Sequence, residues 1–368
     1  MKLATRKKIF YLLLAAFIVL LPIVIAHSLG YTINLSSRSL EQRGGIFIKS
    51  TIASISIFLD NEFQKETSIF SGGALLTEIR PGIHLLRLEK ENYRPWSKTV
   101  TVEKAAVTEI RNVILIPSPV MTATATRDEI ISLGLATTTS ARKIRLDKKN
   151  NLVEDRVLNG RATTTVLTPG VNSFAYIDGA IFFITEAGFA AKLNSNGMIE
   201  TLGRPGFFLS DKIPAQFFIS PRSELAILDA GGGLFIIESE TNELKPLAGG
   251  AKAISFDTEG EKLILKKENS IEILWLQDNE YQPFQKKGLI EQIITLQEPI
   301  LDARWYYYDD AHIVMLTKDG VYFTEIDGRG GRNTGELISE RIDELVTAAD
   351  YPRSIYLRRN KLWKKIEL

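Results

Sequence analysis

The longest unbroken apolar stretch of the chain comes close to its start. Residues 9–26 read IFYLLLAAFIVLLPIVIA and contain no charged side chain. An α-helix of this length covers about 27 Å, which is close to the apolar thickness of a bilayer. We therefore predict a transmembrane helix over residues 9–29. Residues 1–8 then form a cytoplasmic tail, and the polar residues 30–43 form a short stalk.

The charges around this stretch predict its orientation. Basic residues precede it at positions 2, 6, 7 and 8, and the next ones after it are Arg38 and Arg43. Because positive charges resist translocation, the N-terminus should stay in the cytoplasm and the rest of the chain should lie outside. Two alternatives stay open. One is a cleaved signal peptide, whose apolar core is usually shorter than this one. The other is a helix buried in a soluble core.

After Gly44 the hydrophobic pattern changes to the alternation of half-buried β-strands. Apolar and polar residues alternate, and turn signals such as Asp60-Asn61 and Arg80-Pro81-Gly82 separate the segments. The expected strands cover residues 46–50, 54–60, 75–79, 83–90, 97–104 and 107–116. Short strands without helical periodicity predict a small β-sandwich over residues 44–117.

This segment resembles the PEGA domain, a small β-sandwich of bacterial and archaeal envelope proteins. The resemblance rests on a Leu-Asp-Asn turn, a Pro-Gly-x-His segment and a Tyr-x-x-Trp segment in this order. The matching residues are Ala53, Ile55, Ile57, Leu59, Asp60, Asn61, Pro81, Gly82, His84, Leu86, Leu88, Lys90, Tyr93, Trp96, Val100 and Val102. Ser50-Thr51-Ile52-Ala53 departs from the Pro-x-Gly-Ala motif of the family. The resemblance implies a surface location and an interaction function rather than a reaction.

A loose repeat fills the chain beyond a proline-containing linker at residues 118–126. Copies that read strand, turn, strand, turn, strand begin near residues 173, 215, 252, 301 and 342, and a weaker copy covers residues 143–167. Their spacing is that of four-stranded propeller blades. We predict an all-β, propeller-like domain of five to six blades over residues 127–368. Residues 120–135 are expected to supply a closing strand, and residues 289–296 a helical turn. A second β-sandwich is the alternative.

Composition narrows the function. Hydrophobic residues make up 45% of the chain and charged residues 24%, as in a folded protein. The net charge of +1 argues against a nucleic-acid partner. The chain has no cysteine and only three histidines, so disulfides are excluded and we expect no metal site. The motifs of hydrolases and nucleotide-binding enzymes are missing as well, so we expect no cofactor.

Two aromatic clusters are candidate binding residues. Tyr93 and Trp96 flank Pro95 at a corner between strands, where rings can cover a sheet end or stack on a carbohydrate. The second cluster consists of Arg304, Trp305, Tyr306 and Tyr307, followed by Tyr308. Strand alternation predicts that half of its rings are exposed, next to a cation, as a sugar or peptide site requires. For both clusters, core packing is the alternative role.

These features predict a single-pass envelope protein that presents a PEGA-like domain and a propeller outside the cytoplasm. The leading hypothesis is a non-enzymatic binding or scaffolding protein, whose partner is a cell-wall polymer or another envelope protein. One alternative is an exported hydrolase that acts on a wall polysaccharide or peptide through carboxylates at the propeller axis. Another is self-association of the sandwich in the membrane plane.

Overall fold

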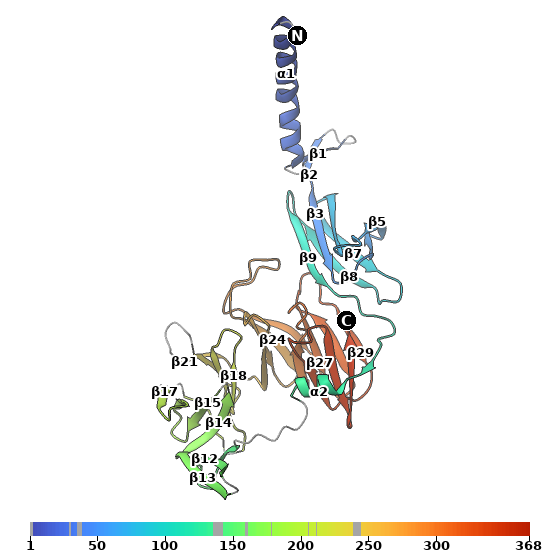
Figure 1. The fold of residues 1–368 in the computed structure, drawn as a ribbon. Helices are drawn as coiled ribbons and strands as arrows, with labels where there is room; N and C mark the ends of the chain where they lie inside the picture. Colours follow the sequence, from blue (N-terminus) through green and yellow to red (C-terminus); the bar gives the residue numbers. More distant parts are fainter. Residues whose placement is uncertain are drawn as a thin grey trace.

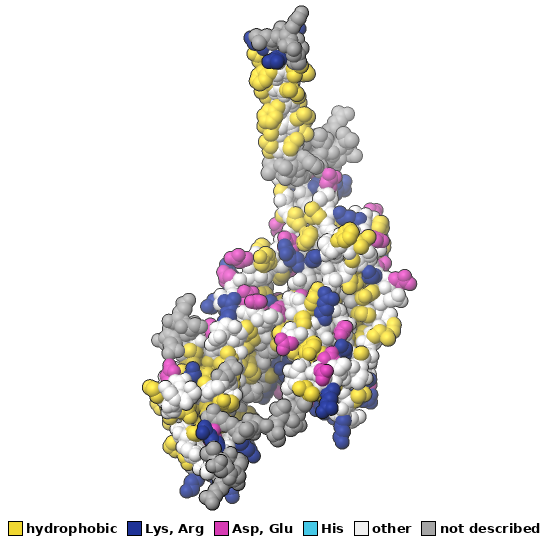
Figure 2. Space-filling model, in the orientation of Figure 1, with side chains coloured by type: hydrophobic (Ala, Val, Ile, Leu, Met, Phe, Trp, Pro, Cys, Tyr) yellow, Lys and Arg dark blue, Asp and Glu magenta, His cyan; other side chains and the backbone are white. Residues whose placement is uncertain are grey.

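The computed structural model describes residues 3–28, 31–34, 39–134, 143–158, 161–177, 179–204, 206–210, 212–237 and 244–368. Helix α1 (Leu3–Ser28) projects away from the β domains, with the sandwich between it and the propeller (Figure 1). It is the one helix in the described part of the chain that is long and apolar enough to cross a membrane, and residues 6–25 are not buried. Basic side chains gather at its N-terminal end (Figure 2). In the region expected to be a stalk, β1 (Tyr31–Asn34) pairs with β2 (Ser39–Gln42).

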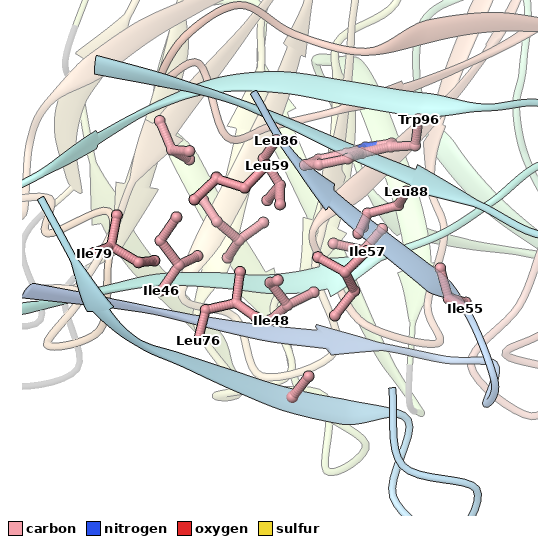
Figure 3. Packing of buried hydrophobic residues seen from close by; sticks show 14 of the residues in the cluster. Ile46, Ile48, Ile55, Ile57, Leu59, Leu76, Ile79, Leu86, Leu88 and Trp96 are labelled. Atoms are coloured by element: carbon pink, nitrogen blue, oxygen red, sulfur yellow. The ribbon is translucent and has the colours of Figure 1, made fainter. Parts of the chain in front are cut away.

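A β-sandwich of two sheets follows, as the alternation predicted. The first sheet has the order β6-β3-β9, with β3 and β9 parallel, and the second has the order β5-β4-β7-β8. The strands are β3 (Gly44–Ser50), β4 (Ser56–Leu59), β5 (Glu62–Glu66), β6 (Gly73–Ile79), β7 (Gly82–Glu89), β8 (Trp96–Val102) and β9 (Val107–Val113). Ile46, Ile48, Ile57 and Leu88 are fully buried between the sheets (Figure 3).

His84 joins two turns of the sandwich, because each of its ring nitrogens lies next to a hydrogen-bond acceptor. Nδ1 of His84 lies 2.7 Å from Oδ2 of Asp60, and Nε2 lies 2.8 Å from the carbonyl oxygen of Arg80. Both contacts are satisfied only when each nitrogen carries a proton. Partial burial opposes the charged ring, but these two hydrogen bonds outweigh it and raise the pKa of His84 above its usual value.

Because the pKa of His84 is raised, the sandwich should lose stability as the pH rises above about 6.5. The stabilisation of the fold by protonated His84 is complete below about pH 6.5, the usual pKa of histidine. It is lost as the pH rises through the raised pKa of the folded state. Melting temperatures of the wild type should fall over this interval, and those of a His84→Gln variant should fall less. Equal slopes for the two proteins would contradict this assignment.

The domain beyond the linker is propeller-like, and its described residues form six sheets. The first has three strands: β11 (Lys143–Leu146), β12 (Leu152–Leu158) and β13 (Arg161–Thr168). The second sheet has four strands: β14 (Val171–Ile177), β15 (Ala180–Thr185), β16 (Ala190–Leu193) and β17 (Ile199–Gly203). The third contains β18 (Gln216–Ile219), β19 (Leu225–Leu228), β20 (Leu234–Ile237) and β21 (Leu244–Ala248). The fourth contains β22 (Ala253–Phe256), β23 (Lys262–Lys266), β24 (Ser270–Trp275) and β25 (Ile290–Thr295). The fifth contains β26 (Asp302–Trp305), β27 (His312–Leu316), β28 (Val321–Glu325) and β29 (Thr334–Ile338).

The sixth sheet confirms the expected closing strand. It consists of β30 (Glu344–Thr347), β31 (Ser354–Arg359) and β32 (Leu362–Glu367), and β10 (Ala123–Thr124) pairs with β32. The helical turn expected at residues 289–296 is wrong. These residues form β25, because their backbone pairs with β24 and Ile293 is buried between two sheets.

Hydrophobic clusters join each sheet of the propeller to the next one along the chain. No such cluster of described residues joins the sixth sheet to the first. Ile355 and Leu357 of β31 face the fifth sheet, and Tyr356, which points to the opposite face, packs beside helix α2 (Arg127–Ser132). Helix α2 therefore covers the face of the sixth sheet that a closed ring would turn toward the first.

Candidate interdomain site

The sandwich is attached to the propeller by a buried ion pair. Nζ of Lys98 lies 2.7 Å from Oε1 of Glu325 and donates a hydrogen bond of 2.8 Å to the carbonyl oxygen of Asp327. The two paired side chains are only 1% and 8% exposed. Nε1 of Trp96 approaches the other oxygen of Glu325 at 3.4 Å. Because burial makes an unpaired charge costly, this pair requires both domains to stay in contact.

A second set of contacts covers the free edge of strand β9. The side-chain amide of Gln282 donates to the carbonyl oxygen of Val107 at 3.0 Å and accepts from the backbone nitrogen of Glu109 at 3.0 Å. It thus imitates the backbone of a neighbouring strand. Arg329 donates to the carbonyl oxygen of Glu109 at 2.7 Å and to Oε1 of Gln282 at 2.9 Å. Propeller loops therefore bind the sandwich through its backbone.

A pocket of about 270 Å³ lies beside these contacts, with walls from both domains. The sandwich contributes Arg111 and Asn112 from β9, and the propeller contributes Tyr281 and the turn that contains Asp310. Its lining includes five carboxylates and three cationic side chains, so negative charge is in excess. Such a pocket attracts cations.

Asp310 differs from the other carboxylates of the lining in its surroundings. Its Oδ2 accepts a hydrogen bond of 3.1 Å from the backbone nitrogen of Thr258, whereas its Oδ1 is buried and has no hydrogen-bond partner among the described residues. Burial raises the pKa of Asp310 to about 6, and the nearby Asp257 adds to the shift. A carboxylate with a raised pKa in a cleft is a candidate functional group.

The raised pKa of Asp310 predicts that the substitution Asp310→Asn stabilises the protein at neutral pH. The ionised carboxylate is less favourable in the folded state, so stability falls as the pH rises from about 4 to about 6. A shift of two units is worth about 3 kcal/mol, and contact with water reduces this to about 1–2 kcal/mol. Denaturation of Asp310→Asn should show this gain at neutral pH and none near pH 4. A gain that is equal at both pH values would show that ionisation is not its cause.

The structure places the predicted residues Tyr93 and Trp96 on the sandwich core. Tyr93 is half-buried and pairs with Pro117 through its backbone, and Trp96 is 5% exposed. Trp96 also lies at the interdomain contact through Nε1 and lines a smaller pocket there. A role of either ring in ligand binding stays a prediction.

The expectation that half of the rings at residues 305–308 are exposed is wrong. Strand β26 ends at Trp305 and the chain turns there, so strand alternation does not continue. Trp305 and Tyr306 are fully buried, and they donate hydrogen bonds to the carbonyl oxygens of Ser255 and Leu368. Tyr307 is half-buried, and the exposed Arg304 pairs with Asp302 at 3.0 Å. Binding by this cluster stays a prediction, for which Arg304 and Tyr307 retain exposed surface.

Sequence reasoning did not identify Lys98, Gln282 or Asp310. The sequence contained a clue to the role of Lys98, because strand alternation places this residue on the same buried face as Trp96 and Val100. A lysine at an inward position requires a buried partner. Within the described ranges, no group of three or more acidic or histidine side chains has an arrangement that could hold a metal ion.

The comparisons with known proteins agree with the fold. The PEGA domain model matches residues 73–114, which extend from β6 to the end of β9. The chain therefore carries a PEGA domain, as the motifs predicted. No curated protein matches the chain.

Several solved structures resemble the chain at low identity. YCF48 from Cyanidioschyzon merolae is 9% identical, with a TM-score of 0.42 over 77% of this chain and 91% of that one. XC5397 from Xanthomonas campestris, described as a gluconolactonase, is 10% identical, with a TM-score of 0.34 over 60% and 82%. A streptogramin B lyase is 11% identical, with a TM-score of 0.37 over 78% and 90%. Likenesses this distant assign neither a ligand nor an activity.

Proposed function

We propose that this chain, with its PEGA domain and β-propeller, is a membrane-anchored binding or scaffolding protein of the bacterial cell envelope. The observation that carries the proposal is the interdomain contact. Lys98 and Glu325 are buried together, and Gln282 and Arg329 bind the backbone of β9. Contacts of this kind hold the two domains in one orientation. With helix α1 anchored in the membrane, the two domains that follow it in the chain would present a rigid surface at a fixed distance from the membrane.

The N-terminal helix supports the anchoring part of the proposal. Its apolar side chains are exposed along residues 6–25, which suits contact with lipid. The basic residues that precede it favour a cytoplasmic N-terminus and an extracytoplasmic body. The partner would then be a wall polymer or another envelope protein.

Fractionation of cells that express the full chain with a C-terminal tag tests the anchor. The intact chain should stay in the membrane after an alkaline wash, and protease added to spheroplasts should remove the tag. Leu14→Arg combined with Ile18→Arg should abolish membrane retention, because each charge costs about 3 kcal/mol at the centre of a bilayer. A mature chain that lacks residues 1–26, or a tag protected from protease, would overturn the proposal.

A second candidate function is the exported hydrolase, which one observation favours. Asp310 has a raised pKa in a cleft, as a general acid requires. Turnover of isolated wall glycan or peptide by the full chain, abolished by Asp310→Asn, would establish this alternative. Binding of the same material without turnover would support the scaffolding function.

A further inference from the structure

The β7 face of the sandwich, which is the outward side of the sheet β5-β4-β7-β8, presents large apolar side chains to solvent. Strand alternation turns Leu86 and Val100 into the core and sends their neighbours outward. On the outward side, Ile83 is 74% exposed, Phe63 is 57% exposed and Leu85 is 41% exposed. An apolar patch on the surface of a soluble domain usually marks an interaction site.

This apolar surface continues beyond the sheet on both sides. A groove of about 500 Å³ lies between Ile83 and Thr101 of the sheet and Phe284 of a propeller loop, which is 68% exposed. At the other edge, the rings of Phe58 and Phe63 meet at a centroid distance of 5.7 Å. The exposed parts of the large apolar side chains amount to on the order of 400 Å², if a whole side chain contributes about 200 Å². A partner in a stable complex buries about 800 Å², so this surface can form the apolar centre of an interface.

The charges of the β7 face indicate which partner fits it. Along β7 and β8 the outward charged side chains are Arg87 and Glu89, which pair with each other, and the guanidinium of Arg87 lies 4.6 Å from the ring centroid of Phe58. The outward side of the other sandwich sheet differs, because it carries the exposed Lys49 and Arg111. Interface centres are depleted of charged residues, and a surface whose charges cancel does not repel a copy of itself. A second copy of the chain therefore fits the β7 face.

We propose that the chain forms a two-fold symmetric dimer in which the β7 faces of two copies pack against each other. The same residues contact each other from both sides, as a closed two-fold interface requires. Sheets that pack face to face keep their strands within about 30° of each other, which a symmetry axis along the strands allows. The sandwich strands run roughly from α1 toward the propeller, so such an axis places both N-terminal helices on the same side (Figure 1). This orientation of the dimer rests on the membrane anchor proposed above, because two chains in one membrane must share it.

Introduced cysteines test the contact in membranes, because the natural chain has no cysteine. Thr99→Cys places a thiol on the β7 face, and the control Thr77→Cys places one on the outward side of the other sandwich sheet; both threonines are exposed. Membranes that contain either full-length variant are treated with a short bis-maleimide. The crosslinked dimer should be the main product for Thr99→Cys and a minor product for Thr77→Cys. Equal yields would indicate random collisions and would overturn the proposal.

Light scattering of the detergent-solubilised full chain measures the mass of the assembly. The wild type should have twice the mass of the monomer, and Ile83→Glu should reduce it to the monomer mass, because like charges then meet at an apolar contact. Leu75→Glu is the matched control, since Leu75 is 42% exposed on the outward side of the other sandwich sheet and its substitution should leave the dimer intact. A monomeric wild type, or a dimeric Ile83→Glu variant, would overturn the proposal. Because the mass is measured in detergent, either result leaves membrane anchoring, which fractionation tests separately, unaffected.

Discussion

Replacing Lys98 with alanine is expected to destabilise the protein by about 3–5 kcal/mol, the usual cost of breaking a buried ion pair. Without this lysine, the carboxylate of Glu325 stays buried, at only 8% exposure, and has no other salt-bridge partner among the described residues. The carbonyl oxygen of Asp327 also loses a donor. Both losses fall on the interdomain contact, so the sandwich should separate from the propeller before either domain unfolds.

Hydrogen exchange and denaturation of the full chain measure this effect. In Lys98→Ala, hydrogen exchange should rise in β8 and β28, the strands that carry the ion pair. Lys104→Ala is the control. It should change neither hydrogen exchange nor the free energy of unfolding, because Lys104 is exposed on the turn after β8. In a double mutant, Glu325→Gln should recover part of the loss, since the amide oxygen can still accept from Asn333. Unchanged exchange in Lys98→Ala would show that the domains are held together by other contacts.

Replacing Trp305 with alanine is the second large perturbation, with an expected cost of about 3–5 kcal/mol. The ring is fully buried between the fourth and fifth sheets, and Nε1 donates a hydrogen bond of 2.8 Å to the carbonyl oxygen of Ser255. The substitution leaves a cavity and an unsatisfied carbonyl group. Trp305→Phe should cost less, because it fills part of the cavity.

Arg304→Ala provides the matched control on the preceding residue. Its guanidinium is exposed and pairs with Asp302, and such pairs are worth about 1 kcal/mol or less. Urea denaturation, followed by tryptophan fluorescence and by circular dichroism, should therefore separate the two variants clearly. A cost below about 1 kcal/mol for Trp305→Ala would contradict its placement in the core and revive a role for this ring in binding.

Much of the architecture could be predicted because it depends on local patterns. Strand alternation indicated the sandwich, and the repeat of three strands and two tight turns indicated the blades. The same logic failed at Tyr306, because whether a strand continues depends on pairing partners that lie elsewhere in the chain. Tyr306 is held by the carbonyl oxygen of Leu368, and no local pattern reveals such a contact.

The candidate site was less predictable for the same physical reason. An inward lysine at position 98 signals a buried partner, but Glu325 lies more than two hundred residues away in the chain. Asp310 belongs to an Asp-Asp turn, a pattern that is usually solvated. Its raised pKa comes from burial in a pocket that two domains build together. Sequence patterns therefore identified the domains, and the chemistry between them required the arrangement in space.

The described residues form no hydrophobic core between the sixth and first sheets, and this affects how the propeller responds to stress. With five packed junctions among the described residues, the six sheets form a row with two ends. A terminal sheet of a row loses one neighbour when it melts, whereas any sheet of a closed ring loses two. The sheet of β11, β12 and β13 is one end of the row. The PEGA domain contacts the fourth and fifth sheets, closer to the other end. Force or heat should therefore unfold the propeller first at the sheet of β11, β12 and β13, while the part that contacts the PEGA domain stays folded.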